Sequence, residues 1–300
     1  MSGTFALAAA REPVLRAGHA FAAPAALLLA MIYVVPVGVL AWLSLTDYEL
    51  GAVDTRFLGL VNFERAVTDP VFRRSIVNTF AYVAIVLPGG VGLGLVAALL
   101  VHRRVRTRSF YEVIYFLPVT STLIAMATVW QFLLHPRLGP VREITLALGL
   151  GEVAFLSDPT LVLPSLAAIG IWQLVGFNMI LFLAGLSAIP RDLYEAAALD
   201  GAGGAIDRFL RVTWPLLGPT TMFVTITTSI TAFKVFDTVA VLTQGGPTGA
   251  SEVLLYAIYL EGFQYFRIGY AAALTLIFLV FILAFSVMQA VALDRRVHYG

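Results

Sequence analysis

Long apolar stretches alternate with short polar segments along the whole chain. A helix needs about 20 apolar residues to cross the hydrocarbon core of a membrane. Six stretches reach this length, and we expect membrane spans at about residues 20–45, 76–101, 113–134, 161–186, 215–242 and 268–293. A helix satisfies its own backbone hydrogen bonds in lipid. The pattern therefore predicts an all-α membrane protein of about six transmembrane helices, with residues 1–300 forming a single transmembrane domain.

The composition supports lipid as the main solvent. Of the 300 residues, 60% are hydrophobic and only 12% are charged, and the mean hydropathy is +0.90. Soluble domains carry about 25% charged residues, so a very apolar soluble protein is the weaker interpretation. The first apolar run follows Arg11 and Arg16 and is longer than the core of a cleaved signal peptide. We expect it to be retained as the first span.

Arginines predict the orientation of the spans. The short segment between the second and third spans holds Arg103, Arg104, Arg106 and Arg108, and basic residues remain on the cytoplasmic side. The loop after the first span also carries arginines, which weakens the signal. With six spans, both termini and the loop at about residues 187–214 are expected to be cytoplasmic.

Several functions are disfavoured by missing motifs. The only lysine, Lys234, lies in the sequence AFKVF, so the chain has no phosphate-binding loop of the Gly-Lys-Ser/Thr type. Cysteine is absent, and neither catalytic nor metal-binding residues are expected. The net charge of +1, without a basic stripe, disfavours nucleic-acid binding. A membrane enzyme has no catalytic cluster to support it, and a proton-coupled transporter needs buried titratable residues that are scarce here.

Small residues occur in a spacing that permits close helix contact. Gly90 and Gly94 form a GxxxG pair in the second span. The sequence leaves open whether this pair serves packing within the chain or an interface with another subunit.

The cytoplasmic loop carries the most informative motif. It reads Glu195-Ala196-Ala197, then three residues, then Gly201, and later Val212-Thr213-Trp214-Pro215. This resembles the EAA loop of permease subunits of bacterial ABC importers. Four further segments look like the carbohydrate-uptake branch of these permeases, which includes maltose and glycerol-3-phosphate permeases. They are FLGLVNF at 57–63, FLPVTST at 116–122, FLAGLSAIP at 182–190 and VLTQGGP at 241–247. The loop departs from the family pattern by one extra residue between Gly201 and Val212 and by Trp214 in place of leucine.

The resemblance implies a type I importer permease in a bacterial inner membrane. It would pair with a second permease subunit, usually a different chain in this branch, and with two copies of a cytoplasmic ABC ATPase. A solute-binding protein would deliver a sugar-like solute from outside. The chain itself would bind no cofactor, since ATP and Mg belong to the partner ATPase, and it would not be an enzyme.

The resemblance also assigns the coupling contact. The EAA helix would enter a cleft of the ATPase through Glu195, Ala196, Ala197, Asp200 and Gly201. Alanines form a strong helix with little bulk, and a glycine can take the positive φ that ends a helix. The alternative is an amphipathic helix lying on lipid, which acidic residues beside an anionic leaflet disfavour.

Polar residues in the fourth and fifth spans are candidates for a solute pathway. Helical spacing places Thr227, Thr231, Lys234 and Thr238 on one face of the fifth span. The full candidate set is Gln173, Phe177, Asn178, Thr227, Thr228, Thr231 and Lys234. The alternative for the threonines is a hydrogen bond to their own helix. For Lys234 the sequence leaves open an anionic group of the solute, a pair with Asp237, or an outward-reaching side chain.

Overall fold

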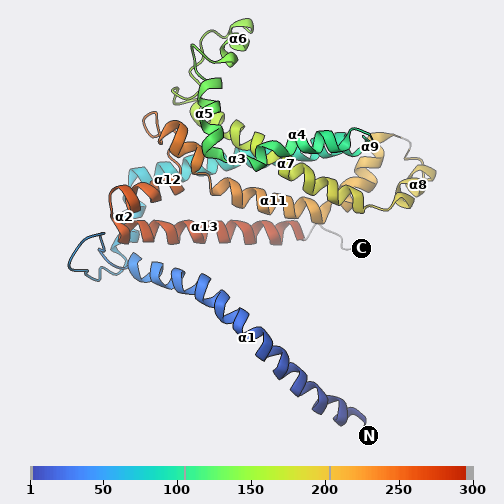
Figure 1. The fold of residues 1–300 in the computed structure, drawn as a ribbon, viewed down its shortest axis with the longest axis horizontal. Helices are drawn as coiled ribbons and strands as arrows, with labels where there is room; N and C mark the ends of the chain where they lie inside the picture. The colour runs from blue at the N-terminus through green and yellow to red at the C-terminus, as the bar shows by residue number, and fades with distance from the viewer. Residues whose placement is uncertain (1–2, 105, 203, 295–300) are drawn as a thin grey trace. The chain divides into compact units, whose positions relative to one another are not determined.

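The computed structural model describes residues 3–104, 106–202 and 204–294, with side chains described from residue 21 to residue 293. The chain forms two compact units: Met1–Ala66 with Glu261–Leu276, and Val67–Leu260 with Ile277–Gly300. Regular structure in the described residues is helical, apart from one antiparallel bridge between Thr46 and Phe57. Figure 1 follows the helices from α1 to α13.

Four helices are long and apolar enough to cross a membrane. They are α1 (Gly3–Ser44) from Phe21 onward, α3 (Pro70–His102), α7 (Val162–Ala188) and α13 (Ile268–Asp294) up to Leu293. Two further candidates are bent pairs: α4 (Arg108–Thr120) with α5 (Leu123–Leu133), and Ala205–Leu216 with α11 (Gly218–Phe233). If each bent pair is one span, the total is six. The predicted all-α membrane fold is confirmed.

The bent pairs change direction within the predicted third and fifth spans. The axis turns by 99° between α4 and α5, because Ser121 and Thr122 are both extended, with ψ of 138° and 132°. The axis turns by 69° before α11, where Pro219 lacks a backbone N–H group and Leu217 ends the preceding turn. The remaining helical segments are α2 (Val61–Thr68), α6 (Pro140–Ala147), α8 (Arg191–Leu199), α9 (Ala205–Arg208), α10 (Trp214–Leu216), α12 (Leu254–Tyr259) and the π-helical turns η1 (Phe209–Thr213), η2 (Val239–Thr243) and η3 (Leu260–Gln264).

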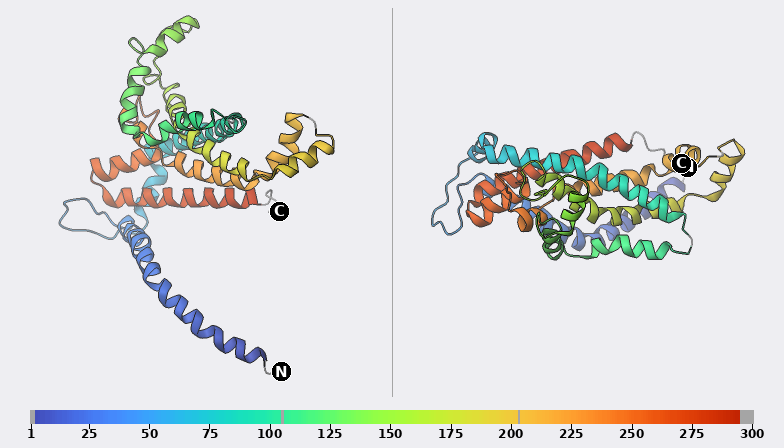
Figure 2. Two further views of the ribbon diagram at one scale, coloured as in Figure 1. Left: turned by 45° about the vertical axis from the view of Figure 1, so that its right-hand side comes forward. Right: turned by 90° about the horizontal axis from the view of Figure 1, so that it is seen from above.

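The larger unit is built around α7. This helix contacts α3, α4 and α11, and Figures 1 and 2 show α3 and α7 side by side. Ala97, Ala98, Met179, Phe182 and Val224 belong to its buried core. A Cβ atom added to Gly94 would lie 2.6 Å from the Cβ of Asn178. The GxxxG pair therefore serves close packing of α3 against α7 within the chain.

The part of α13 that lies in the larger unit joins this bundle through aromatic and polar contacts. Phe281 meets Phe80 edge to face, and Phe285 meets Phe233 with ring centroids 5.0 Å apart. The Ser229 hydroxyl donates to Oε1 of Gln289 at 2.7 Å. A buried hydroxyl in an apolar surrounding needs such a partner, so this bond fixes the register of α13 on α11.

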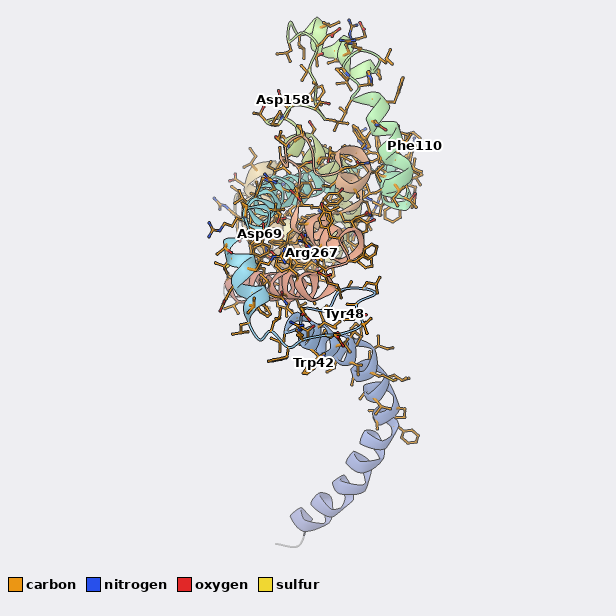
Figure 3. All side chains as sticks on the ribbon, turned by 90° about the vertical axis from the view of Figure 1, so that its left-hand side faces the viewer. Trp42, Tyr48, Asp69, Phe110, Asp158 and Arg267 are labelled. Carbon is orange, nitrogen blue, oxygen red and sulfur yellow. The ribbon has the colours of Figure 1, made fainter. Side chains whose placement is uncertain are left out.

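The loop after η2 begins with the QGGP part of the VLTQGGP segment and is anchored on the first turns of α3. Asp69 caps this helix by accepting hydrogen bonds from the Val71 and Phe72 amides (Figure 3). Arg74 forms a 3.1 Å ion pair with Glu252, and the amide of Asn78 donates to the Gly249 and Glu252 carbonyls. Side chains of α3 thus satisfy backbone groups of a loop that follows it by about 170 residues in sequence.

The smaller unit is held by the FLGLVNF segment. Its Asn62 is buried and donates to the carbonyls of Ser44 and Thr46, at 2.9 and 2.8 Å, where α1 ends. The Gly269 amide donates to the Tyr48 carbonyl, and the Arg65 guanidinium lies 4.1 Å from the centre of the Tyr270 ring. The end of α1 is therefore fastened to the first turn of α13 within this unit.

Candidate coupling loop and solute pathway

The EAA segment forms the helix α8, which ends at a well-defined cap. Gly201 follows the helix with φ of +88°. The Ala202 amide donates to the Ala197 carbonyl at 2.9 Å, and the Gly201 amide donates to the Ala198 carbonyl at 3.3 Å. These two bonds around a left-handed glycine form a Schellman cap. The chain thus turns sharply at Gly201, the residue predicted to end this helix.

The two faces of α8 differ in their surroundings. Tyr194 and Ala197 are half-buried and pack on the core of the larger unit. Glu195, Ala196 and Asp200 are exposed. The predicted coupling residues therefore lie together on α8 and its C-terminal cap, with the acidic side chains directed away from the bundle and Ala197 turned toward it.

The second half of the loop returns to the membrane helices through a π-helical turn. The hydroxyls of Tyr194 and Thr213 lie 3.1 Å apart and connect α8 to η1. Trp214 follows this turn, remains 46% exposed and lies near Phe209. The loop is thus a hydrogen-bonded unit whose parts are connected to each other and to α7.

A cavity of about 340 Å³ lies between α3, α7 and α11, and it contains three of the predicted pathway residues. Gln173 of α7 and Thr231 and Lys234 at the end of α11 all line it. Tyr82 and Asp237 line it as well and were not among the candidates. The phenol of Tyr82 within the predicted second span was the available signal for this residue, whereas the candidates all came from the fourth and fifth spans.

The other predicted pathway residues lie elsewhere. Asn178 and Thr228 are fully buried, and the Thr228 hydroxyl donates to Oδ1 of Asn178 at 3.1 Å. Thr227 donates to the Phe223 carbonyl of its own helix at 2.8 Å, and Phe177 is 39% exposed outside this cavity. Of the predicted set, the structure therefore groups three residues at one cavity and joins two others in a contact between α7 and α11.

The chemistry of this cavity suits hydroxyl-rich molecules. An amide, a hydroxyl and a phenol offer both donors and acceptors, and Lys234 adds a cation. Across the described part of the chain, no carboxylate lies within ion-pairing distance of Lys234, Asp237 included. The same part of the chain contains no cluster of three His, Cys, Asp or Glu side chains arranged to hold a metal ion.

Membrane-length helices that pack around a cavity with several polar side chains are the architecture of a multi-pass membrane protein. Residues 90–299 match the family model described as binding-protein-dependent transport system inner membrane component, and the chain belongs to this family.

Relatives of similar length support the same family. The chain is 31% identical over 281 residues to the sn-glycerol-3-phosphate transport system permease protein UgpA of Agrobacterium fabrum, covering 93% of this chain and 94% of the relative. It is 34% identical over 275 residues to the probable ABC transporter permease protein YurN of Bacillus subtilis, covering 90% of this chain and 94% of the relative. The predicted membership of this permease family is confirmed.

Solved structures show the same fold. A chain in the crystal structure of a bacterial ABC transporter involved in the import of the acidic polysaccharide alginate aligns with a TM-score of 0.78 and 24% identity, covering 95% of this chain and 96% of that chain. A second structure, of the alginate transporter in complex with a periplasmic protein bound to an alginate pentasaccharide, also aligns with a TM-score of 0.78.

Proposed function

We propose that this protein is the permease subunit of an ATP-driven ABC importer, and that it moves a sugar-like solute into the cytoplasm. Oligosaccharides, polyols and glycerol 3-phosphate define the solute class. The family membership supports the role of a permease, and the relatives that transport sn-glycerol 3-phosphate support the solute class. ATP and Mg would bind to the partner ATPase, and this chain would carry no cofactor.

The observation that carries the coupling proposal is the geometry of α8. An exposed acidic face, set by a Schellman cap and backed by the core, is a rigid short helix available to another subunit. We assign Glu195 and Asp200 to charged contacts with the ATPase, and Ala196 to close approach. Ala197 and Gly201 would keep the helix seated and correctly ended. Closure of the ATPase pair would then be transmitted through Tyr194 and Thr213 to the membrane helices.

For the solute pathway we propose the cavity lined by Gln173, Thr231 and Lys234. Their side chains would bind hydroxyl groups, and Lys234 would hold an anionic group when the solute has one. Asn178 and Thr228 would act indirectly, by holding α7 to α11 behind the cavity. Phe177 and Thr227 would lie on flanking surfaces of the same helices.

The proposed assembly contains a second permease subunit, two ATPase subunits and an extracytoplasmic solute-binding protein. Both termini, the 103–108 segment and the loop at residues 187–214 would face the cytoplasm of a bacterial cell with the chain in its inner membrane. This arrangement brings α8 and the ATPase to the same side.

Purification of the complex from native membranes tests this function. The full chain, isolated in mild detergent, should retain an ABC ATPase, recognised by a peptide with a phosphate-binding loop, at two copies per complex. The alternative, an ion-coupled transporter, needs no ATPase. Isolation of the chain without an ATPase, combined with uptake driven by an ion gradient alone, would contradict the proposal.

A further inference from the structure

The cavity between α3, α7 and α11 has polar side chains beyond the three assigned to the solute pathway. Tyr82 of α3 lines it, together with Asp237 and Thr238 from the segment between α11 and η2. Distant parts of the sequence thus supply a phenol, a carboxylate and a hydroxyl to one space. The hydrogen-bonding groups of these three side chains have no role in the proposed function.

The Tyr82 hydroxyl lies at the cavity without a hydrogen bond. Tyr82 is 4% exposed, and a Cβ atom added at Gly170 of α7, another lining residue, would clash with the tyrosine Oη. The glycine therefore gives the phenol room to extend from α3 to α7. Among the described residues this hydroxyl has no hydrogen-bond partner. Buried tyrosine hydroxyls usually find one, so this hydroxyl is available to a molecule in the cavity.

Thr238 and Asp237 present two further groups without partners. Thr238 is 2% exposed, and its Oγ1 atom has no hydrogen-bond partner in the part of the chain that the structure describes. Asp237 is half-buried and forms no ion pair within the same residues. Most buried polar groups in proteins are hydrogen-bonded. Two buried hydroxyls and a carboxylate around one cavity therefore favour a polar molecule that completes their hydrogen bonds.

We propose that Tyr82, Asp237 and Thr238 form a subsite that recognises a vicinal diol of the solute. An ionised carboxylate only accepts hydrogen bonds and has two oxygens, so Asp237 can accept from two neighbouring hydroxyls at once. The tyrosine and threonine hydroxyls can each donate to a diol oxygen. Because a carboxylate repels an anion, the diol would lie at Asp237 and an anionic group of the solute at Lys234, which lines the same cavity.

This subsite gives the cavity a preference within the proposed solute class. A vicinal diol has one torsion between its hydroxyl-bearing carbons, whereas a 1,3-diol has two that must be fixed on binding, at a cost in conformational entropy. The subsite should therefore favour hydroxyls on neighbouring carbons. Its role in transport rests on the proposed function, whereas the binding preference can be measured on the chain alone.

Binding of two isomeric glycerol phosphates to the full chain in detergent tests the subsite. sn-Glycerol 3-phosphate carries a vicinal diol, and glycerol 2-phosphate carries the same charge with its two hydroxyls on alternate carbons. By calorimetric titration, we expect the 3-phosphate to bind to the wild-type chain at least about fivefold more tightly than the 2-phosphate. This ratio should fall below about twofold in Tyr82→Phe, Asp237→Asn and Thr238→Val, because each variant keeps its shape and loses a hydrogen-bonding group or its charge.

Two variants outside the cavity are the matched controls. Tyr115→Phe on α4 and Thr225→Val on α11 remove the same kinds of hydroxyl and should keep the wild-type ratio. The proposal would be overturned by a wild-type chain that binds neither isomer or binds both equally. An unchanged ratio in any of the three subsite variants, or its loss in the controls, would overturn it as well.

The subsite and the proposed function can fail separately. Lys234→Gln should weaken the binding of both isomers, because each carries a phosphate. If it does so while the subsite variants keep the wild-type ratio, the diol subsite is wrong and the solute pathway stands. A chain that retains no ATPase, yet shows the ratio and loses it in the subsite variants, would support the subsite and contradict the importer.

Discussion

Substitution of Gly201 by valine perturbs the end of α8 without creating a clash. A Cβ atom added at this position would meet no atom within 4 Å, so the cost comes from the backbone alone. Because φ is +88°, a β-branched residue here costs about 1–3 kcal/mol of backbone strain. Because 1.4 kcal/mol is a factor of ten in an equilibrium constant, the intact cap should become about 5 to 150 times less populated relative to its opened forms.

The loss of the cap has a local readout and a functional one. Hydrogen exchange of the Gly201 and Ala202 amides, which donate to Ala198 and Ala197, should become faster by that factor. In proteoliposomes containing the partner subunits, Gly201→Val should lower the retention of the ATPase or the uptake per ATP hydrolysed. Membrane insertion should be normal, because no membrane-length helix is altered.

Two controls make this test specific. Gly201→Asn should be much milder, since asparagine tolerates the left-handed region. Gly204→Val places the same residue three positions later, where φ is −87° and ψ is 154°, and this extended conformation suits valine. Unchanged amide exchange, full ATPase retention and full uptake in Gly201→Val would show that this glycine sets neither the end of α8 nor its coupling to the ATPase.

Three further predictions concern the solute pathway and the orientation. Gln173→Ala and Thr231→Ala should each raise the half-saturating solute concentration about 2- to 10-fold, because each loses one hydrogen bond worth about 0.5–1.5 kcal/mol. Thr225→Ala is the control, because Thr225 lies on the same helix as Thr231 but outside the cavity, and it should leave this concentration unchanged. Wild-type values in both cavity variants would remove these residues from the proposed pathway. Lys234→Gln should weaken the binding of an anionic solute by about 10- to 100-fold and leave the binding of a neutral polyol unchanged, as measured by competition for uptake. Equal effects on both solutes would exclude a charge contact. A cysteine that replaces the exposed Ser157 should react with an impermeant maleimide in intact cells, whereas a cysteine that replaces the exposed Ser109 should not. Labelling of the cysteine at position 109 would reverse the predicted orientation.

Hydropathy was sufficient to predict the membrane fold, because lipid requires long apolar helices with internally satisfied backbones. It did not predict the bends, because the 99° turn at Ser121 and Thr122 depends on two extended residues within an otherwise apolar run. Hydropathy also did not predict η1, a π-helical turn at Phe209–Thr213 that connects the coupling loop to the following helix.

The pathway residues show the limit of helical periodicity. The spacing put Thr231 and Lys234 on one face of α11, and both line the cavity. It did not show which neighbour each face meets. Asn178 meets Thr228 across a tight contact with α11, and this choice depends on the packing of three helices.

We propose that an ATPase bound at α8 drives the movement of solute through this chain. The most direct measurement is the ATPase activity of the complex in proteoliposomes, with its binding protein, screened across sugars, polyols and glycerol phosphates. We expect at least one solute to stimulate ATP hydrolysis together with its own uptake, and we expect Gly201→Val to uncouple hydrolysis from uptake. Solute uptake that proceeds at the same rate without ATP would contradict it.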